Sequence, residues 1–144
     1  MQKLSRHQER EQVFHLLFET IFRQGEEPSQ IYAIAKDEKE LPDVDYIRNT
    51  YFGTLEHLTE IDALINTYAK GRSATQMSNV IRSILRLAVY EIKYLDDIKP
   101  AISINEAVEL AKKYEDIRLK GYVNGVLHSI YKDIYPDGTS NEEK

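Results

Sequence analysis

MSNVIRSILRLAVYEIKYL, residues 77–95, is the stretch that decides the fold. Its apolar residues recur every three or four positions, which is the period of an α-helix. They cover so wide an arc of that helix that we expect neighbours on several sides. These residues are Val80, Ile81, Ile84, Leu85, Leu87, Ala88 and Ile92. The sequence therefore predicts a central helix from Met77 to about Leu95.

The segments on both sides of this helix carry the same period, and none shows the sustained alternation of a half-buried strand. We expect further helices over residues 5–24, 29–36, 43–69, 103–114 and 116–134. The segment 43–69 is either one long helix or two helices joined near Thr59. The prediction is an all-α protein of about seven helices.

Three of these helices carry signals for their first turn. Ser5 with Gln8, and Ser103 with Glu106, have the spacing of a capping box, in which two side chains satisfy free backbone N–H groups. Asp43 is a capping candidate for the helix that follows it.

The last predicted helix contains Asn124-Gly125, which in isolation is a signal for a hairpin turn. Because the apolar period continues through this pair, we expect a helix here. Gly121 and Gly125 cost about 1 kcal/mol each relative to alanine in a helix. We interpret them as positions where another helix approaches closely.

The composition fits one domain that folds in water. The chain has 144 residues, 42% of them hydrophobic and 30% charged, and a net charge of −5. We expect a single domain over residues 1–135 and a flexible tail over residues 136–144. No apolar run approaches the roughly 18 residues that span a bilayer, and the first residues are too polar for a signal peptide. The absence of cysteine is typical of a reduced compartment, so a cytoplasmic protein without membrane contact is expected.

No pattern of residues predicts an active site, a cofactor or a metal site. The phosphate-cradling loops and nucleophile elbows that have known sequence signatures are absent. The four histidines lack the helical spacings that aim metal ligands together. Paired carboxylates such as Glu106 and Glu109 fit a helix cap and a solvated face. The sequence therefore favours a protein that is not an enzyme.

Basic residues are unevenly distributed in this acidic chain. Residues 1–60 hold 7 Lys and Arg against 12 Asp and Glu, whereas residues 77–132 hold 9 against 7. Tyr122 lies close to Lys120 and Arg118, and such neighbours can stack on unpaired bases while they neutralise phosphate. A core position for Tyr122 is the alternative. Arg82 and Arg86 face either phosphate or buried carboxylates such as Glu91.

Three stretches at the C-terminal end, IRSILRLAVYEIKYL, ISINEAVELAKKY and KGYVNGVLHSIYKDI, resemble in this order the hallmark blocks of the NusB family of transcription antitermination factors. The resemblance covers roughly residues 5–134. It implies two helical bundles packed against each other and a role in antitermination at ribosomal RNA operons. It also implies binding of single-stranded boxA RNA together with ribosomal protein NusE, and indirect contact with other Nus factors and RNA polymerase.

The resemblance also implies an RNA surface at the start of the first helix and the start of the last helix. Carried over position by position, the candidate RNA-binding residues are Arg6, Arg10, Phe18, Lys120, Tyr122 and Asn124, and Arg118 adds a cation where the family commonly has an acid. We expect the two groups to converge into one groove. The NusE-facing surface is expected around the central helices and Glu91.

The chain departs from the family pattern in ways that leave alternatives open. His7, Gln8 and Glu9 fill places where the family often has consecutive arginines, and Gly121-Tyr122 stands where Lys-Phe is common. A helical module that binds only protein, as a NusE adaptor or a homodimer, is therefore the second hypothesis. Methyl transfer, known where this domain is fused to ribosomal RNA methyltransferases, is the third, and 144 residues leave no room for a cofactor-binding sheet.

Overall fold

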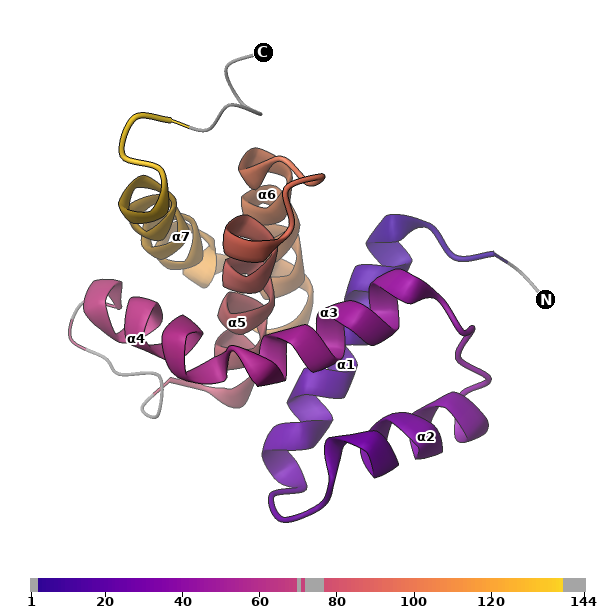
Figure 1. Ribbon diagram of the computed structural model, residues 1–144. Coiled ribbons are helices and arrows are strands. Elements are labelled where there is room, and N and C mark those ends of the chain that lie inside the picture. The colour runs from indigo at the N-terminus through magenta and orange to yellow at the C-terminus, as the bar shows by residue number, and fades with distance from the viewer. Residues whose placement is uncertain (1–2, 70, 72–76, 139–144) are drawn as a thin grey trace.

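The computed structural model describes residues 3–69, 71 and 77–138. In this part of the chain there are seven α-helices and one short 3₁₀-helix, with no strand (Figure 1). The elements are α1 (Arg6–Phe22), α2 (Pro28–Glu38), α3 (Asp45–Glu56), α4 (Leu58–Tyr68), α5 (Asn79–Tyr94), α6 (Pro100–Tyr114), η1 (Ile117–Leu119) and α7 (Lys120–Ile134). The predicted all-α fold is confirmed.

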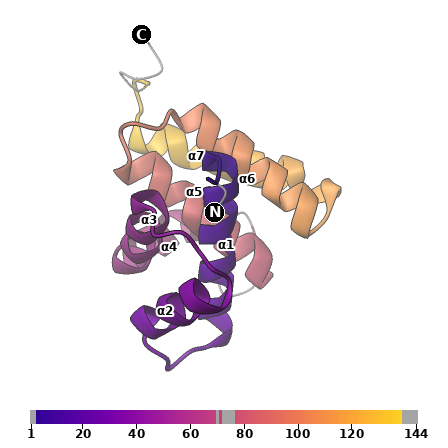
Figure 2. The same ribbon diagram turned by 90° about the vertical axis from the view of Figure 1, so that its right-hand side faces the viewer.

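The helices form two bundles, and α5 of the second bundle also contacts the first. Helices α1, α2 and α3 make the first bundle, and α4 to α7 make the second (Figures 1 and 2). Helix α5 packs against α1, α3, α4, α6 and α7, as its wide apolar arc predicts. The two bundles therefore pack as one body around the predicted central helix.

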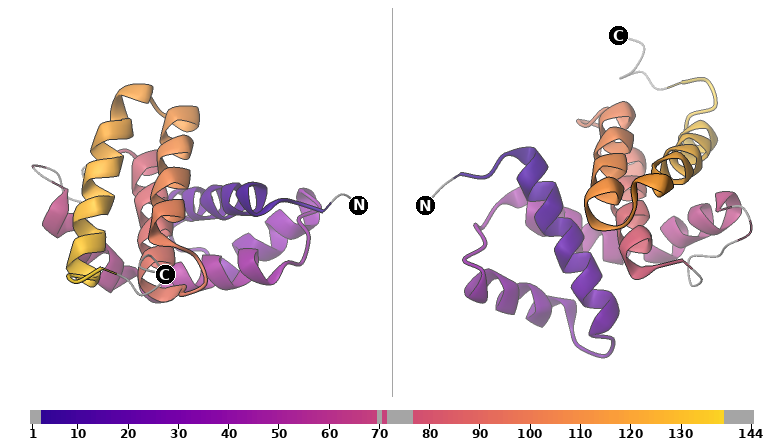
Figure 3. Two further views of the ribbon diagram at one scale, coloured as in Figure 1. Left: turned by 90° about the horizontal axis from the view of Figure 1, so that it is seen from above. Right: turned by 180° about the vertical axis from the view of Figure 1, so that it is seen from behind.

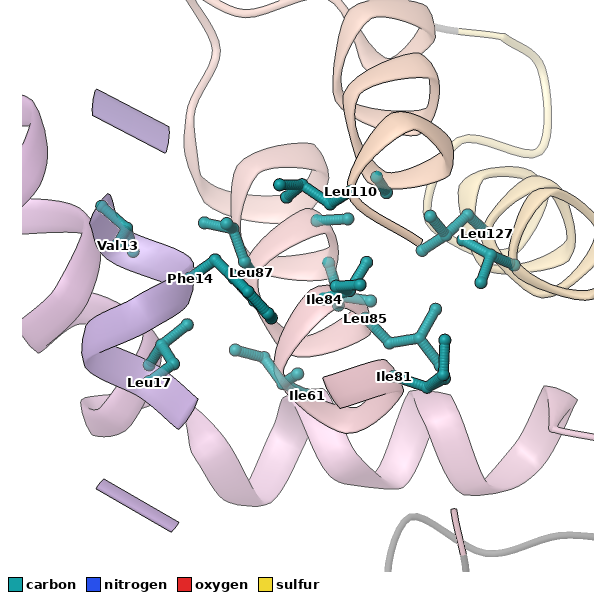
Figure 4. Close-up of a cluster of buried hydrophobic side chains, with 14 of the residues drawn as sticks. Val13, Phe14, Leu17, Ile61, Ile81, Ile84, Leu85, Leu87, Leu110 and Leu127 are labelled. Carbon is teal, nitrogen blue, oxygen red and sulfur yellow. The ribbon is translucent and has the colours of Figure 1, made fainter. Parts of the chain in front are cut away.

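The core is built of apolar side chains that converge on α5 from four other helices. Figure 4 shows this cluster around Ile84, Leu85 and Leu87, with contributions from Phe14 and Leu17 of α1, Ile61 of α4, Leu110 of α6 and Leu127 of α7. Each of these side chains is at most 3% exposed. Full burial of one such side chain contributes about 1.5–3 kcal/mol, so this cluster dominates the stability of the fold.

The first capping prediction is confirmed and the one at Asp43 is wrong. The Gln8 backbone N–H donates to Ser5 Oγ at 3.1 Å, and the Ser5 N–H donates to Gln8 Oε1 at 2.8 Å. The cap residue of α3 is Val44, without a side-chain cap, and Asp43 instead accepts from Arg48 at 2.7 Å. The segment 43–69 forms two helices that break at His57.

The capping box at Ser103 and Glu106 is also wrong. Helix α6 begins at Pro100, because proline has no N–H to leave unsatisfied in the first turn and its φ suits a helix. Ser103 is buried in the second turn, where its hydroxyl donates to Glu91 Oε1 at 2.7 Å. Its hydrogen bond holds α6 against α5 rather than capping α6.

The glycines of α7 do not mark a helix contact, contrary to the prediction. A Cβ built at Gly121 or Gly125 would meet nothing within 4 Å, and both residues are exposed. Close approach occurs instead at Gly53 of α3, where the Tyr90 ring of α5 occupies the space of a Cβ. Within the described residues, no helix is long and apolar enough to cross a membrane.

Candidate nucleic-acid interface

The first turn of α1 presents one partly exposed arginine. The Arg6 side chain is 48% exposed, and its Nε lies 3.2 Å from Glu9 Oε1. Its guanidinium carbon lies 4.2 Å from the centre of the Tyr46 ring of α3. This cation–π contact holds the guanidinium at the surface. Arg6 therefore has the exposure that a phosphate contact requires.

Arg10, one turn later, is only 4% exposed. Its Nε donates to Glu91 Oε2 at 2.8 Å, and its Nη1 lies 3.3 Å from Glu106 Oε1. Burial lowers the pKa of Arg10, but the charges of Glu91, Tyr46 and Glu106 and the hydrogen bond to Glu91 together outweigh it, so the pKa is raised and the cation is retained. The assignment of Arg10 as a phosphate contact does not fit this burial. Its guanidinium instead neutralises the buried carboxylate of Glu91.

Glu91 is fully buried at the meeting point of four helices. Its carboxylate accepts hydrogen bonds from Arg10 of α1, Tyr46 of α3 and Ser103 of α6. Burial and the neighbouring Glu91 charge raise the pKa of the Tyr46 hydroxyl, which stays protonated as a donor. Because Glu91 has no exposed surface, its own side chain does not face a partner, and the NusE-facing surface around the central helices stays a prediction.

An aromatic row continues along α1 beyond the arginines. Phe18 is half-buried and packs edge-on against Phe22, with ring centres 4.9 Å apart. Phe22 is 64% exposed. The row begins at Phe14, whose ring centre lies 5.0 Å from that of Tyr114 at the end of α6. Spacing of four residues from Phe18 could have identified Phe22, which the sequence reasoning missed.

Two contacts tie the middle of α1 to the last turn of α6. Lys113 Nζ lies 2.6 Å from Glu11 Oε2, and the Tyr114 hydroxyl donates to the same carboxylate. These bonds, together with the charge of Lys113, lower the pKa of Glu11 against the raising effect of burial. Arg6 and Phe18 therefore lie on opposite sides of this junction along α1.

The chain turns from α6 into α7 through η1. Asp116 was expected to open the last helix, but it caps η1 by accepting from the Arg118 N–H at 2.8 Å. The Arg118 side chain is 86% exposed and also binds the Asp116 carboxylate at 2.7 Å. Hydrogen bonds from Arg118 lower the pKa of Asp116 to about 2. Arg118 is thus an exposed cation that a neighbouring acid partly neutralises.

Helix α7 starts at Lys120, later than predicted. Lys120 and Asn124 are exposed on its first turns, where the positive end of the helix dipole favours anions. Tyr122 is half-buried, and its hydroxyl donates to the Ala69 carbonyl at 3.3 Å. Tyr122 therefore combines the two roles considered for it, since it packs against α4 and keeps part of its surface open.

The two candidate zones lie on either side of α6. The views agree that α6 stands between α1 and α7 (Figures 1 and 3). Arg6 and Phe18 belong to α1, and Arg118, Lys120, Tyr122 and Asn124 belong to the η1–α7 corner. A surface that joins them has to pass around the C-terminal end of α6, by way of Tyr114. Within the described residues, no group of three or more His, Asp or Glu is placed to hold a metal ion.

The model of the NusB family matches residues 7–132. The chain belongs to the NusB family. It is 42% identical over 127 residues to transcription antitermination protein NusB of Agathobacter rectalis, which covers 86% of this chain and 97% of that protein. It is 35% identical over 141 residues to the NusB protein of Ruminiclostridium cellulolyticum, covering 97% of both chains. Membership of the NusB family agrees with the expectation of a non-enzymatic protein.

Solved NusB structures have the same arrangement of helices. NusB of T. maritima superposes with a TM-score of 0.84 at 33% identity, covering 99% of this chain and 98% of that one. A crystal structure of the antitermination factors NusB and NusE in complex with dsRNA gives a TM-score of 0.78 at 30% identity, covering 90% and 99%. The NusB fold inferred from three sequence blocks is therefore confirmed over the whole described chain.

Proposed function

We propose that this chain is a non-enzymatic transcription antitermination factor that binds boxA RNA of ribosomal RNA operons together with ribosomal protein NusE. The observation that carries the proposal is the set of exposed cations at Arg6, Arg118 and Lys120, with the half-buried ring of Phe18 beside them, on a NusB fold. The solved NusB complex with NusE and dsRNA supports this assignment.

The proposed RNA surface combines two kinds of contact. Exposed cations neutralise phosphates without regard to sequence. Exposed aromatic rings stack on unpaired bases, at about 1–3 kcal/mol per base. Phe18 with Phe22 supplies such rings on α1, and Tyr122 supplies the open part of its ring on α7. This pairing suits a single strand whose bases are unpaired.

The charge of the molecule sets the expected strength of binding. A net charge of −5 and the burial of Arg10 leave few cations for phosphate. The protein alone should therefore bind RNA weakly, and NusE should supply further contacts. The proposed place of action is the cytoplasm.

The test is the affinity of the purified protein for a fluorescent boxA RNA, measured by anisotropy with and without NusE. We expect tighter binding with NusE, and weaker binding as the salt concentration rises. Lys120→Gln should weaken binding, whereas Lys36→Gln on α2 is the matched control that should not. Equal RNA affinity with and without NusE, together with an RNA affinity that does not change with salt concentration, would contradict the proposal.

A second function is favoured by one observation. Phe22 is 64% exposed beside Phe18, and an aromatic face of this kind can be covered by a second copy or by a protein partner. In that case the chain is a protein-binding module with little RNA affinity. Capture of NusE by a protein that binds no RNA at any salt concentration would favour this second function.

A further inference from the structure

The last turn of α6 carries a lysine in the middle of the candidate interface. Lys113 faces α1, where its Nζ lies 2.6 Å from Glu11 Oε2. Along α1 this contact falls between Arg6 and Phe18, and along the chain Lys113 comes just before η1. Lys113 therefore lies where a strand that joins the two candidate zones has to pass.

The ion pair with Glu11 leaves the ammonium group of Lys113 open to a ligand. The Lys113 side chain is 59% exposed, whereas the Glu11 side chain is 14% exposed. The Tyr114 hydroxyl also donates to the Glu11 carboxylate. A ligand that arrives from solvent therefore meets the ammonium group before the carboxylate. Because an ammonium group has three donors and Glu11 accepts from one of them, donors remain for phosphate oxygens.

Positive charge outweighs negative charge at this junction. His15 lies one helical turn after Glu11 on α1, and burial lowers its pKa, followed by the charge of Lys39 at the end of α2. Lys113 lowers the pKa of His15 as well, and the two lysines together outweigh Glu11, which raises it. Glu11 therefore weakens the positive potential around His15 without reversing it, so that an anionic strand is attracted here.

Aromatic rings beside Lys113 favour a nucleic acid over an acidic peptide. The Lys113 Nζ lies 5.3 Å from the centre of the Tyr114 ring. That ring is edge-on to the ring of His15, with centres 5.2 Å apart, and both side chains are partly exposed. A cation next to partly open rings offers a contact for a phosphate and a surface for the neighbouring base or ribose.

The position of Lys113 within α6 does not by itself indicate a ligand. The helix dipole favours any cation in the last turn of α6, and Lys112 lies there as well. Lys112 pairs with Glu109 of the same helix at 3.3 Å, whereas the acid that binds Lys113 belongs to α1. The two lysines share the helix turn and differ in the side of α6 that they occupy, which makes Lys112 a matched control.

We propose that Lys113 binds a phosphodiester of the RNA strand beside the ring of Tyr114, so that the last turn of α6 joins the two candidate zones into one surface. The inference rests on the proposed function and deepens it. It adds α6 to the elements that contact the RNA directly, next to α1 and the η1–α7 corner.

The test compares Lys113→Gln, Lys113→Arg and Lys112→Gln with the wild-type protein. The affinity for boxA RNA is measured by anisotropy across a range of salt concentrations. Loss of one phosphate contact on a single strand lowers the salt slope by about 0.7. We expect this smaller slope for Lys113→Gln, with about a fivefold loss of affinity at about 0.1 M salt. Lys113→Arg should keep the slope, and Lys112→Gln should behave as wild type.

Thermal unfolding first establishes that each variant is folded at the assay temperature. A purely structural role of the ion pair with Glu11 would lower the RNA affinity equally at all salt concentrations, so an unchanged slope for Lys113→Gln would overturn the inference. The same decrease for Lys112→Gln would overturn it too, and so would loss of NusE binding with the RNA slope intact. In these cases RNA binding by the wild-type protein still supports the proposed function. Absence of RNA binding by the wild type would overturn both.

Discussion

Arg10 and Glu91 form the buried ion pair on which the junction of the two bundles depends. Removing one partner leaves the other charge buried and unpaired, which costs about 3–5 kcal/mol. Arg10→Gln should therefore lower the free energy of unfolding by about this amount, measured by urea denaturation. Arg48→Gln at the surface is the control and should show no comparable loss. A loss below about 1 kcal/mol for Arg10→Gln would contradict the structural role of the pair.

The same variant separates a structural residue from an RNA contact. Because the Arg10 guanidinium is buried, folded Arg10→Gln protein should keep the wild-type dependence of RNA affinity on salt. The sequence could not reveal this burial. Arg10 lies near the N-terminus, and its partner Glu91 lies 81 residues away on another helix. Only the tertiary packing shows that they meet.

Asp116 restrains Arg118, an exposed cation of the candidate interface. Its carboxylate binds the Arg118 guanidinium, which holds the pKa of Asp116 at about 2. Asp116→Asn should release Arg118 and remove a negative charge, so RNA affinity should rise and its salt slope should steepen. Asp97→Asn, after the end of α5, removes the same charge elsewhere and serves as the control. Equal effects of the two variants would show that only net charge matters.

His15 gives the fold a predictable dependence on pH. Burial lowers the pKa of His15 below its ordinary value of 6.5, and the charges of Lys39 and Lys113 act in the same direction, against Glu11. The unfolded chain therefore takes up a proton more readily than the folded protein. Stability contributed by neutral His15 is complete above about pH 6.5 and is lost as the pH falls below it.

Urea denaturation at a series of pH values between about 7.5 and 5.5 tests this prediction. The wild-type free energy of unfolding should fall over this range, and His15→Gln should fall less. His128→Gln, at an exposed position on α7, should follow the wild type. The same slope for His15→Gln and wild type would exclude this role for His15.

At the scale of single elements, the exposed glycines of α7 lower its helix propensity, and no close packing contact at these positions compensates for that loss of stability. A Cβ at Gly125 meets nothing within 4 Å, so alanine is accommodated without strain. Gly125→Ala should stabilise the protein by up to about 1 kcal/mol through helix propensity, measured by thermal unfolding. Gly53→Ala is the contrasting variant, because the Tyr90 ring must move to admit the methyl group. A lower melting temperature for Gly125→Ala would contradict the open environment described for it.

The helices themselves could be predicted because apolar period is a property of each segment alone. The wide apolar arc of residues 77–95 predicted that α5 packs against several helices, as it does against five. Helix ends were less predictable. Ser103 has the spacing of a cap, but its hydroxyl binds Glu91 of α5, and a partner on another helix leaves no local signal.

At the scale of the whole molecule, the arrangement of the candidate site could be predicted only in part. The candidate residues were expected on the first and last helices, and the structure places all of them there except Arg118, which lies in η1. The resemblance did not show that α6 stands between them (Figure 3). Nor did it show that Tyr46, 40 positions beyond Arg6 in the chain, supports the Arg6 guanidinium. Both features arise from how the bundles pack, and the spacing of residues within one segment of the sequence does not predict that packing.

We propose that one RNA strand contacts α1 and the η1–α7 corner around the end of α6. The most direct test measures the salt dependence of boxA RNA binding for Arg6→Gln, Lys120→Gln and the double variant. We predict that each single variant lowers the salt slope by about 0.7 and that the double variant lowers it by about 1.4. A slope that one of the single variants leaves unchanged would contradict the claim, because the RNA would then contact only one of the two zones.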